Sequence, residues 1–289
     1  MTTIGIVSPG AMGAAVGRAL RAGGSRVVAT VDGRSERTAH LAASLELLPT
    51  LDDVVGAADI VLSIVPPRDA VEVAAAIAAS ANRRAVRPVV ADLNAIAPTT
   101  METVAIRLRE ARLAVVDGSI SGPPPHAAGT TIVYLSGSEA GRIASLEPRW
   151  LEFRVVGETV GMASAIKMST ASFYKGQAAI FLQALRAAEA NRVLEVVLDD
   201  LRRHYPELVD DAPRLLQNVA AKSGRFVAEM HEIAATQEQV GLTPDLFTAV
   251  ATVYLELSRS EAASRSPEQA DPEASLEDVL GALSKTAHP

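Results

Sequence analysis

The 289-residue chain has no cysteine, few aromatic residues and no cluster of basic side chains. Without cysteine it can form neither disulfides nor thiolate metal sites, which suits a reducing cytoplasm. One Trp, four Tyr and five Phe leave the cores to aliphatic residues. A net charge of −7 without a basic patch argues against nucleic acid or an anionic membrane as partner. No apolar run is long enough to span a bilayer and no signal peptide precedes the first strand, so we expect a cytoplasmic protein.

Up to about residue 157, short β-rich segments alternate with amphipathic helical segments such as Ala11–Ala22, Ser35–Ser44 and Thr99–Ala111. Several of the β segments are continuously apolar, as strands covered on both faces are. This alternation predicts an α/β Rossmann domain with a doubly wound, mostly parallel sheet. The predicted strands are Thr3–Val7, Arg26–Val31, Asp59–Val65, Pro88–Leu93, Leu113–Asp117, Thr131–Ser136 and Phe153–Val156.

The composition of the sequence changes after this region. No proline interrupts an Ala- and Leu-rich segment from Thr159 to Tyr205, and helical sequence continues to Leu257. We expect a dinucleotide-binding domain of residues 1–157, an all-helical substrate and dimerisation domain of residues 158–263, and a mobile tail of residues 264–289 with a short helix at Ser275–Leu283. Apolar residues surround most of the long segment, and a helix that is apolar all round must be covered on all sides. A homodimer is therefore expected.

A glycine-containing turn follows the first predicted strand and opens the first helix. In this context Gly10 lets backbone amides approach a pyrophosphate, and Gly13 lets the helix pack close to the strand. Ser8 stands where such a fingerprint usually has its first glycine. The alternative is a strand–turn–helix without ligand, but position and order favour a cofactor. The expected phosphate-binding residues are Ser8, Pro9, Gly10, Ala11, Met12 and Gly13.

Residues after two further strands are candidates for the rest of the cofactor. Asp32 is placed to accept the ribose hydroxyls of NAD, whereas Arg34 and Ser35 would hold the 2′-phosphate of NADP. We favour NADP, with NAD possible. Asn94 follows the strand at Pro88–Leu93, at the edge where ligands of such sheets bind, although turn chemistry explains it equally well.

Four segments resemble the β-hydroxyacid dehydrogenases, which include 3-hydroxyisobutyrate dehydrogenase and the N-terminal domain of 6-phosphogluconate dehydrogenase. They are Leu62–Pro67, Asp117–Pro124, Gly157–Lys167 and Gly224–Ala234, the last similar to a branch whose C-terminal domain has no characterised function. The resemblance covers most of the chain to about Ser258 and implies fold and reaction type rather than substrate.

The resemblance also implies roles for single residues. It places Val65 and Pro66 beside the nicotinamide, and it makes Lys167 the group that takes or gives the hydroxyl proton during hydride transfer. Lys167 is also the most suggestive proton carrier of the long helical segment; the alternative is a surface lysine. Ser121 and the Gly122 amide would orient a substrate acid group.

Two departures from the family pattern bear on the substrate. Pro123 replaces a glycine in the substrate motif and removes an amide donor. Ala171, four residues after Lys167, replaces an asparagine on the same helical face. Tyr174 returns to that face and could supply a replacement hydroxyl. Further substrate candidates are Pro123, Lys175 and Glu229.

The sequence thus predicts an NADP-preferring dehydrogenase or reductase that acts on a small hydroxy or oxo acid. An imine reductase on the same fold is one alternative. A dinucleotide-binding sensor or scaffold that has lost catalysis is another, because Ser8, Pro123 and Ala171 depart from the family pattern. No metal site is expected, since no His-x-x-x-His pair occurs and the acidic residues are scattered.

Overall fold

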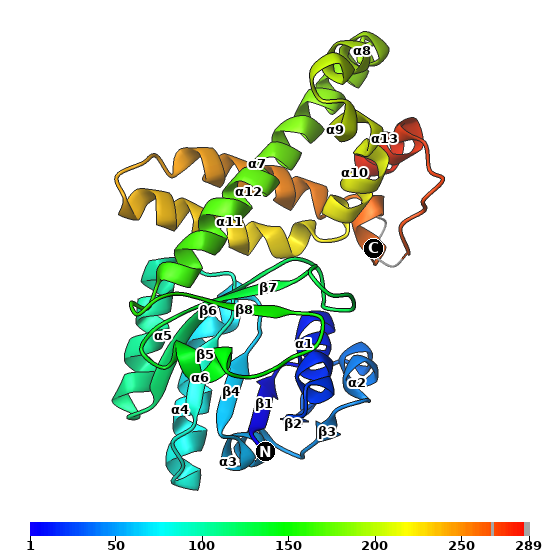
Figure 1. The fold of residues 1–289 in the computed structure, drawn as a ribbon. Coiled ribbons are helices and arrows are strands. Elements are labelled where there is room, and N and C mark those ends of the chain that lie inside the picture. The colour runs from blue at the N-terminus through cyan, green and yellow to red at the C-terminus, as the bar shows by residue number, and fades with distance from the viewer. Residues whose placement is uncertain (267–268, 286–289) are drawn as a thin grey trace. The chain divides into compact units, whose positions relative to one another are not determined.

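The computed structural model describes residues 1–266 and 269–285 (Figure 1). By its internal contacts the chain divides into two compact units, Met1–Ser169 and Thr170–Pro289. The first unit therefore extends twelve residues past the expected boundary at 157, because the start of the next helix is hydrogen-bonded to the sheet, as shown below. None of the helices in the described part of the chain has the length and apolarity needed to cross a membrane.

The first unit is built on one eight-stranded sheet. Its strands are β1 (Thr3–Val7), β2 (Arg26–Ala29), β3 (Glu46–Leu47), β4 (Ile60–Ser63), β5 (Val89–Asp92), β6 (Ala114–Ser121), β7 (Ile132–Ser136) and β8 (Glu152–Gly157). They lie in the order β3-β2-β1-β4-β5-β6-β7-β8, and all neighbours are parallel except β6 and β7. This confirms the predicted doubly wound, mostly parallel sheet. Strand order reverses between β1 and β4, the place where such sheets bind ligands.

Helices cover both faces of the sheet. They are α1 (Ala11–Ala22), α2 (Glu36–Ala42), α3 (Leu51–Ala57), η1 (Pro67–Asp69), α4 (Ala70–Arg84), α5 (Pro98–Glu110) and α6 (Ala140–Ala144). Successive strand residues point to opposite faces. Ile60 and Leu62 therefore join a core with α1 and α6, whereas Val61 joins a second core with α3, α4 and α5. Two cores explain why the central strands are continuously apolar.

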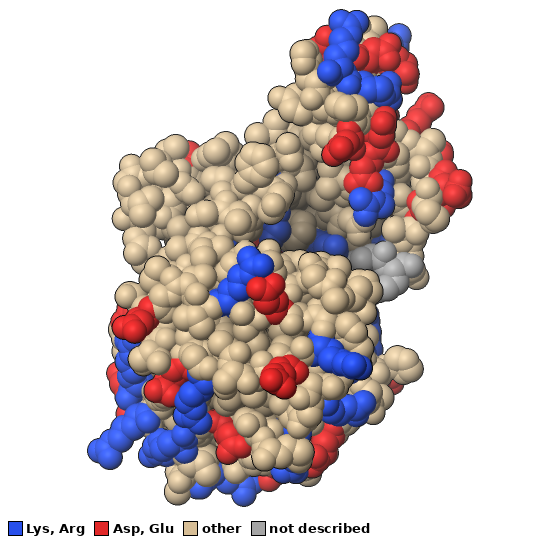
Figure 2. Space-filling view, in the orientation of Figure 1, with Lys and Arg blue, Asp and Glu red and all other residues tan. Residues whose placement is uncertain are grey.

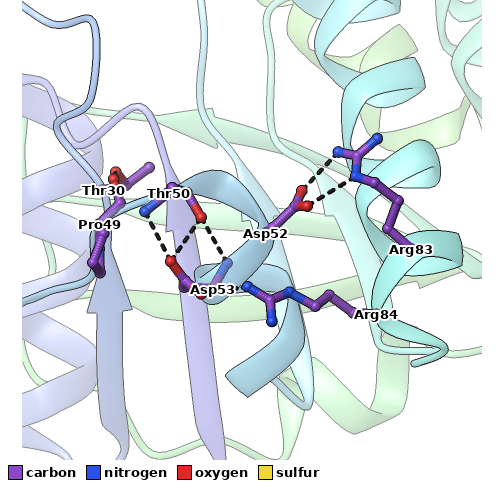
Figure 3. A network of polar contacts seen from close by, with 7 residues as sticks. All are labelled: Thr30, Pro49, Thr50, Asp52, Asp53, Arg83 and Arg84. Carbon is purple, nitrogen blue, oxygen red and sulfur yellow. Dashed lines mark hydrogen bonds and ion pairs between the residues drawn. The ribbon is translucent and has the colours of Figure 1, made fainter.

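Polar contacts fasten α3 to α4 (Figure 3). The Thr50 hydroxyl and the Asp53 carboxylate form a reciprocal capping box at the start of α3. Asp52 accepts two hydrogen bonds from Arg83, at 2.8 Å from Nε and 2.7 Å from Nη2, and Asp53 pairs with Arg84. The Arg83 hydrogen bonds lower the pKa of Asp52. This network stabilises the packing of α3 against α4 within the first unit.

The second unit is helical, as the sequence predicts. Its helices are the later part of α7 (Met162–Ala190), then α8 (Leu194–His204), α9 (Pro206–Asp210), α10 (Ala212–Ala220), α11 (Ser223–Gln239), α12 (Asp245–Leu257), η2 (Glu261–Ser264) and α13 (Leu276–Ser284). The long segment breaks once, where Arg192 adopts a φ of 59°. The short helix expected in the tail is α13, which Ser275 caps and which buries Leu280.

Candidate functional site

The turn after β1 is tight and brings the start of α1 close to the end of the strand. Ser8 takes a left-handed φ of 63°, the conformation for which glycine is preferred at this place. Its carbonyl accepts from the Gly10 amide at 2.8 Å. A Cβ on Gly13 would lie 2.7 Å from the same carbonyl, so the helix can approach the turn this closely only with glycine there. Serine thus makes the tight turn that the fingerprint usually gives to glycine.

The start of α1 has room and polarity for an anion. A Cβ on Gly10 would meet no atom of the described chain within 4 Å. The first turn of α1 contains no acidic residue, and no side chain in the described residues caps it. Its N–H groups carry the positive end of the helix dipole at the point where the strand order reverses. These residues fit the pyrophosphate of a dinucleotide.

Beyond β2, the residues expected at the adenosine ribose lie on an exposed turn. Asp32 donates its backbone N–H to Thr30 Oγ1 at 3.2 Å, and the turn beyond it faces solvent. The hydroxyl of Ser35 caps α2 by accepting from Thr38 N at 3.3 Å. The exposed Arg34 forms no ion pair within the described chain. Gly33, between Asp32 and Arg34, has a φ of 67°, so the chain turns at this point.

A row of residues crosses the sheet close to the carboxyl ends of its central strands. Strand register sets them side by side, from β1 through β4, β5 and β6 to β7: Val7, Ser63, Asp92, Asp117 and Ser136. All five are buried. Four are polar, and two of the four are carboxylic acids on adjacent strands. Buried acids need partners, and each has a different set.

Asp92 is satisfied by Asn94 alone among the described residues. Its Oδ1 accepts from the Asn94 backbone N–H at 3.0 Å and its Oδ2 from Asn94 Nδ2 at 2.8 Å. Burial raises the pKa of Asp92 to about 7; the two hydrogen bonds from Asn94 oppose this rise and the nearby Asp117 charge adds to it. Asn94 Oδ1 in turn accepts from Val65 N at 2.6 Å. The structure therefore joins two of the expected cofactor residues, Asn94 and Val65.

Asp117 fastens the start of α7 to the sheet. Its Oδ2 accepts from the backbone N–H groups of Gly161 at 2.8 Å and Ser164 at 3.1 Å, and from Ser136 Oγ at 2.9 Å. Its Oδ1 accepts from Ser164 Oγ at 2.7 Å. Two nearby bonds add to this anchor, from Ser119 Oγ to the Ala163 carbonyl and from Ala163 N to Ser136 Oγ. Four donors, two of them N–H groups at the start of the helix, stabilise the Asp117 carboxylate where it is buried.

Lys167 lies one turn beyond this anchor. Its Nζ donates to the carbonyl of Ile120 at 2.8 Å, immediately before Ser121. Gly122 adopts a φ of 115°, and a Cβ there would lie 2.1 Å from the Thr130 carbonyl. The structure thus brings Lys167, Ser121 and Gly122 to the same end of β6. Pro123 follows with an exposed ring, and its carbonyl accepts from Thr131 Oγ1 at 2.7 Å.

Tyr174, Lys175 and Glu229 belong to the second unit. Tyr174 is exposed and stacks edge-on against Phe173. Lys175 and Glu229 form an ion pair that ties α7 to α11, with the Lys175 Nζ 4.4 Å from the centre of the Phe226 ring. Both charged groups are mostly buried, so each is needed to balance the other.

Sequence reasoning missed most of the residues that organise this region. Asp92 and Asp117 lie in segments that the sequence analysis covers, but no role was predicted for either side chain. No local sequence pattern marks the three serines around them, Ser63, Ser136 and Ser164. The signal shared by the strand residues is position, since each is a register partner of another polar strand end. Among the described residues, no three His, Cys, Asp or Glu side chains are grouped so as to hold a metal ion.

Two family matches account for most of the chain. Residues 3–162 match the NAD binding domain of 6-phosphogluconate dehydrogenase, and residues 188–257 match a domain of unknown function, DUF1932. The first match covers the glycine turn, the row across the sheet and the start of the anchored segment. It supports an oxidoreductase with a nicotinamide cofactor and leaves the choice between NAD and NADP open.

The chain is also similar to proteins whose own function is uncharacterised. The chain is 29% identical over 173 residues to an uncharacterized 28.5 kDa protein of Methanothermus fervidus; the match spans 59% of this chain and 65% of that relative, slightly less than two thirds. A solved conserved protein of unknown function, described as structurally similar to 3-hydroxyacid dehydrogenases, is 26% identical, with a TM-score of 0.66 and coverage of 89% of this chain and 96% of the other.

Two solved enzymes share the fold at lower identity. The 3-hydroxyisobutyrate dehydrogenase of Mycobacterium tuberculosis is 19% identical, with a TM-score of 0.67 over 93% of this chain and 98% of the other. An imine reductase from Myxococcus stipitatus in complex with NADP+ is 20% identical, with a TM-score of 0.57 over 97% and 99%. Since the same fold carries both, the fold does not choose between oxygen and nitrogen substrates.

Proposed function

The chain belongs to the family of the NAD binding domain of 6-phosphogluconate dehydrogenase, and on this premise we propose that it is a dehydrogenase or reductase for a small hydroxy or oxo acid. The observation that carries the proposal is the hydrogen bond from Lys167 Nζ to the Ile120 carbonyl. It holds a primary amine at the end of β6, in the same unit as the glycine turn at Ser8–Gly13.

Lys167 is the proton carrier in this proposal. A bound nicotinamide supplies hydride acceptance or donation, and the protein must move the accompanying proton. The Lys167 amine takes the proton from a substrate hydroxyl during oxidation and returns it during reduction. Ile120 keeps the amine in place, and Asp117 fixes the helix on which it stands. Proton transfer depends on such positioning as much as on acidity.

The substrate acid group is assigned to the loop that begins at Ser121. The Ser121 hydroxyl and the Gly122 amide are the donors offered there, and Pro123 offers none. A hydrogen bond from Thr131 Oγ1 to the Pro123 carbonyl joins the two ends of this loop. With one amide fewer than the family motif provides, the site suits a carboxylate held at a different angle, or a less charged analogue. Tyr174, Lys175 and Glu229 remain further substrate or catalytic candidates on the second unit.

NADP is the proposed cofactor, with NAD as the alternative. Arg34 is exposed beside Ser35 at the end of β2, where a 2′-phosphate would lie. Asp32 on the same turn would repel that phosphate and favours the ribose hydroxyls of NAD. Arg34 offers a cation that no carboxylate of the described chain neutralises by an ion pair, and this favours NADP.

A homodimer is proposed for the assembly. The second unit has an open apolar groove of about 410 Å³ between α7, α8, α9 and α12. Phe173 and Ile180 line it with side chains 65% and 61% exposed. Figure 2 shows few charges over the ends of α11 and α12, in contrast to α8, where both signs cluster. A second copy of the chain would cover such a surface symmetrically.

The decisive experiment is oxidation of NADPH and NADH in the presence of a panel of small oxo acids and cyclic imines, followed by loss of nicotinamide absorbance. Turnover with oxo acids, and hydroxy-acid oxidation in reverse, is the expected result. Turnover with imines alone would make the protein an imine reductase. Tight cofactor binding without turnover of any compound in the panel would support the sensor or scaffold instead.

A further inference from the structure

A chain of three hydrogen-bonded groups links β5 to Val65, the second residue after β4. Asp92 holds the backbone N–H and the side-chain NH₂ group of Asn94, and the Asn94 amide oxygen holds the Val65 N–H. Ser63 Oγ is a second acceptor for Asn94 Nδ2, at 3.3 Å. Asp92 and Asn94 are 1% and 3% exposed. Solvent therefore offers neither side chain an alternative partner, and the orientation of the Asn94 amide is decided inside the protein.

Above about pH 7 Asp92 is ionised, and its carboxylate permits one orientation of that amide. A carboxylate only accepts, so it requires the Asn94 NH₂ group on its side. The amide oxygen must then face the opposite way, where the Val65 N–H needs an acceptor. If the amide turned over, two oxygens would meet at Asp92 and two donors at Val65. Each such contact leaves buried polar groups unsatisfied.

We infer that Asp92 is a positioning residue for the nicotinamide half of the cofactor, acting through Asn94 on the backbone at Val65. The inference rests on the proposed dinucleotide site. The pyrophosphate turn follows β1 and the adenosine ribose residues follow β2, so the other half of a dinucleotide lies on the β4 side of the reversal point. Val65 and Pro66 form the backbone there. Asp92 touches neither cofactor nor substrate and sets the position of a segment that does.

The polarity of the link can be reversed without changing its net charge. In Asp92→Asn the new NH₂ group faces the NH₂ group of Asn94, so the Asn94 amide is expected to turn over and release Val65. In Asn94→Asp two carboxylates face each other. The double variant Asp92→Asn/Asn94→Asp restores every pair. The carboxylate, now at position 94, accepts from Val65 N and from the amide now at position 92, and the Ser63 hydroxyl donates instead of accepting.

The test is equilibrium binding at pH 8, where Asp92 is ionised, and it needs no substrate. The dissociation constant of NADPH is compared with that of its fragment 2′,5′-ADP, and that of NADH with that of ADP. Each is measured on wild type, both single variants and the double variant. The adenine fragments report that the fold and the phosphate turn are intact. Each single variant is expected to lose about tenfold in affinity for the whole dinucleotide while binding the fragment normally, and the double variant is expected to recover most of this loss. Ser63→Ala is the matched control. It removes one acceptor of Asn94 Nδ2 but keeps the Asp92 carboxylate, so the loss of dinucleotide affinity should be smaller.

Two results would overturn the inference: single variants that bind NADPH and NADH like wild type, or a double variant that binds no better than either single variant. The fluorescence of bound reduced nicotinamide gives a second reading, since a released Val65 segment should shift it towards that of free cofactor. Wild type that binds cofactor but turns over no substrate would count against the proposed reaction alone, because the swap measures positioning without catalysis.

Discussion

The hydroxyl of Ser164 donates to Asp117 Oδ1 at 2.7 Å, so that a buried carboxylate on β6 caps the first turn of α7. The same carboxylate accepts the Ser164 backbone N–H. Lys167 stands three residues further along this helix, and its amine returns to β6 at Ile120. One strand therefore fixes both the start of the helix and the end of the lysine side chain that it carries.

Removal of the Ser164 hydroxyl should destabilise the protein measurably. Ser164→Ala leaves Asp117 buried with one donor fewer, a loss of about 1–3 kcal/mol in the free energy of unfolding. Urea unfolding followed by circular dichroism measures it. Thr103→Ala is the control, because that hydroxyl is exposed and bonds within its own helix, to the Thr99 carbonyl. Equal effects of the two substitutions would show that the cap contributes no more than a surface hydroxyl does.

Lys167→Met should lower turnover by roughly 10²–10⁴-fold, the range for loss of a general acid or base. Cofactor affinity should change little, because Lys167 bonds to the end of β6, where the substrate acid group is assigned. Steady-state rates with the best substrate of the panel and a cofactor titration provide both numbers. Tyr174→Phe is made in parallel. Near-normal turnover in folded Lys167→Met, together with a large loss in Tyr174→Phe, would transfer the role to Tyr174.

Asp92 should make stability fall as the pH rises from about 4 to 7. Burial raises its pKa to about 7 in the folded protein, against about 4 in the unfolded chain. Between these values the folded state holds a proton that the unfolded state has lost, so rising pH favours unfolding. Above about pH 7 both states are ionised and the effect levels off. A shift of this size corresponds to at most about 4 kcal/mol.

Asp92→Asn isolates this contribution, because asparagine does not titrate. The difference in unfolding free energy between wild type and variant, measured by denaturant titration at several pH values, should move in favour of the variant between about pH 5 and 7 and then stay constant. Titrating groups far from Asp92, Asp52 among them, are common to both proteins and cancel. A difference that is flat across this range would mean that Asp92 is ionised throughout.

Local patterns in the sequence predicted the sheet and its first helix well. Alternating apolar segments mark strands, and the predicted Ala11–Ala22 is the observed α1. The buried polar row was not predictable in the same way, because strand register creates it. Asp92 and Asp117 become neighbours only through the pairing of β5 with β6, and Ser164 reaches Asp117 across 47 residues. β6 also runs to Ser121, past the predicted end at Asp117, since its last residues pair with β7.

NADPH should bind more tightly than NADH, and Arg34→Ala should remove most of the preference. The guanidinium beside Ser35 has the geometry and charge to hold a 2′-phosphate, whereas NADH offers it only hydroxyls. Fluorescence titration of both cofactors measures the ratio. Arg107→Ala, an exposed arginine on α5, is the control for net charge. A wild type that prefers NADH, or an Arg34→Ala variant with unchanged NADPH affinity, would assign the turn to NAD through Asp32.

The last prediction concerns assembly. The apolar groove of the second unit is lined by α7, α8, α9 and α12, and Phe173, Ile180, Tyr205 and Leu246 are exposed around it. Exposed apolar side chains are common singly, but a contiguous group around a groove marks an interaction surface. We expect a homodimer that buries more than about 2,000 Å², the range of obligate interfaces. Sedimentation equilibrium at low micromolar concentration should give twice the chain mass of 30.2 kDa.

Ile180→Lys decides whether this groove is the interface. A lysine there would place a charge in an apolar contact on both sides of a two-fold axis, so it should shift the equilibrium strongly towards monomer. Ile106→Lys is the matched control, since Ile106 is similarly exposed on α5 of the first unit. If both variants remain dimeric, another surface joins the subunits. If wild type is a folded, active monomer of 30.2 kDa, the apolar groove needs no second copy and the assembly proposal is refuted.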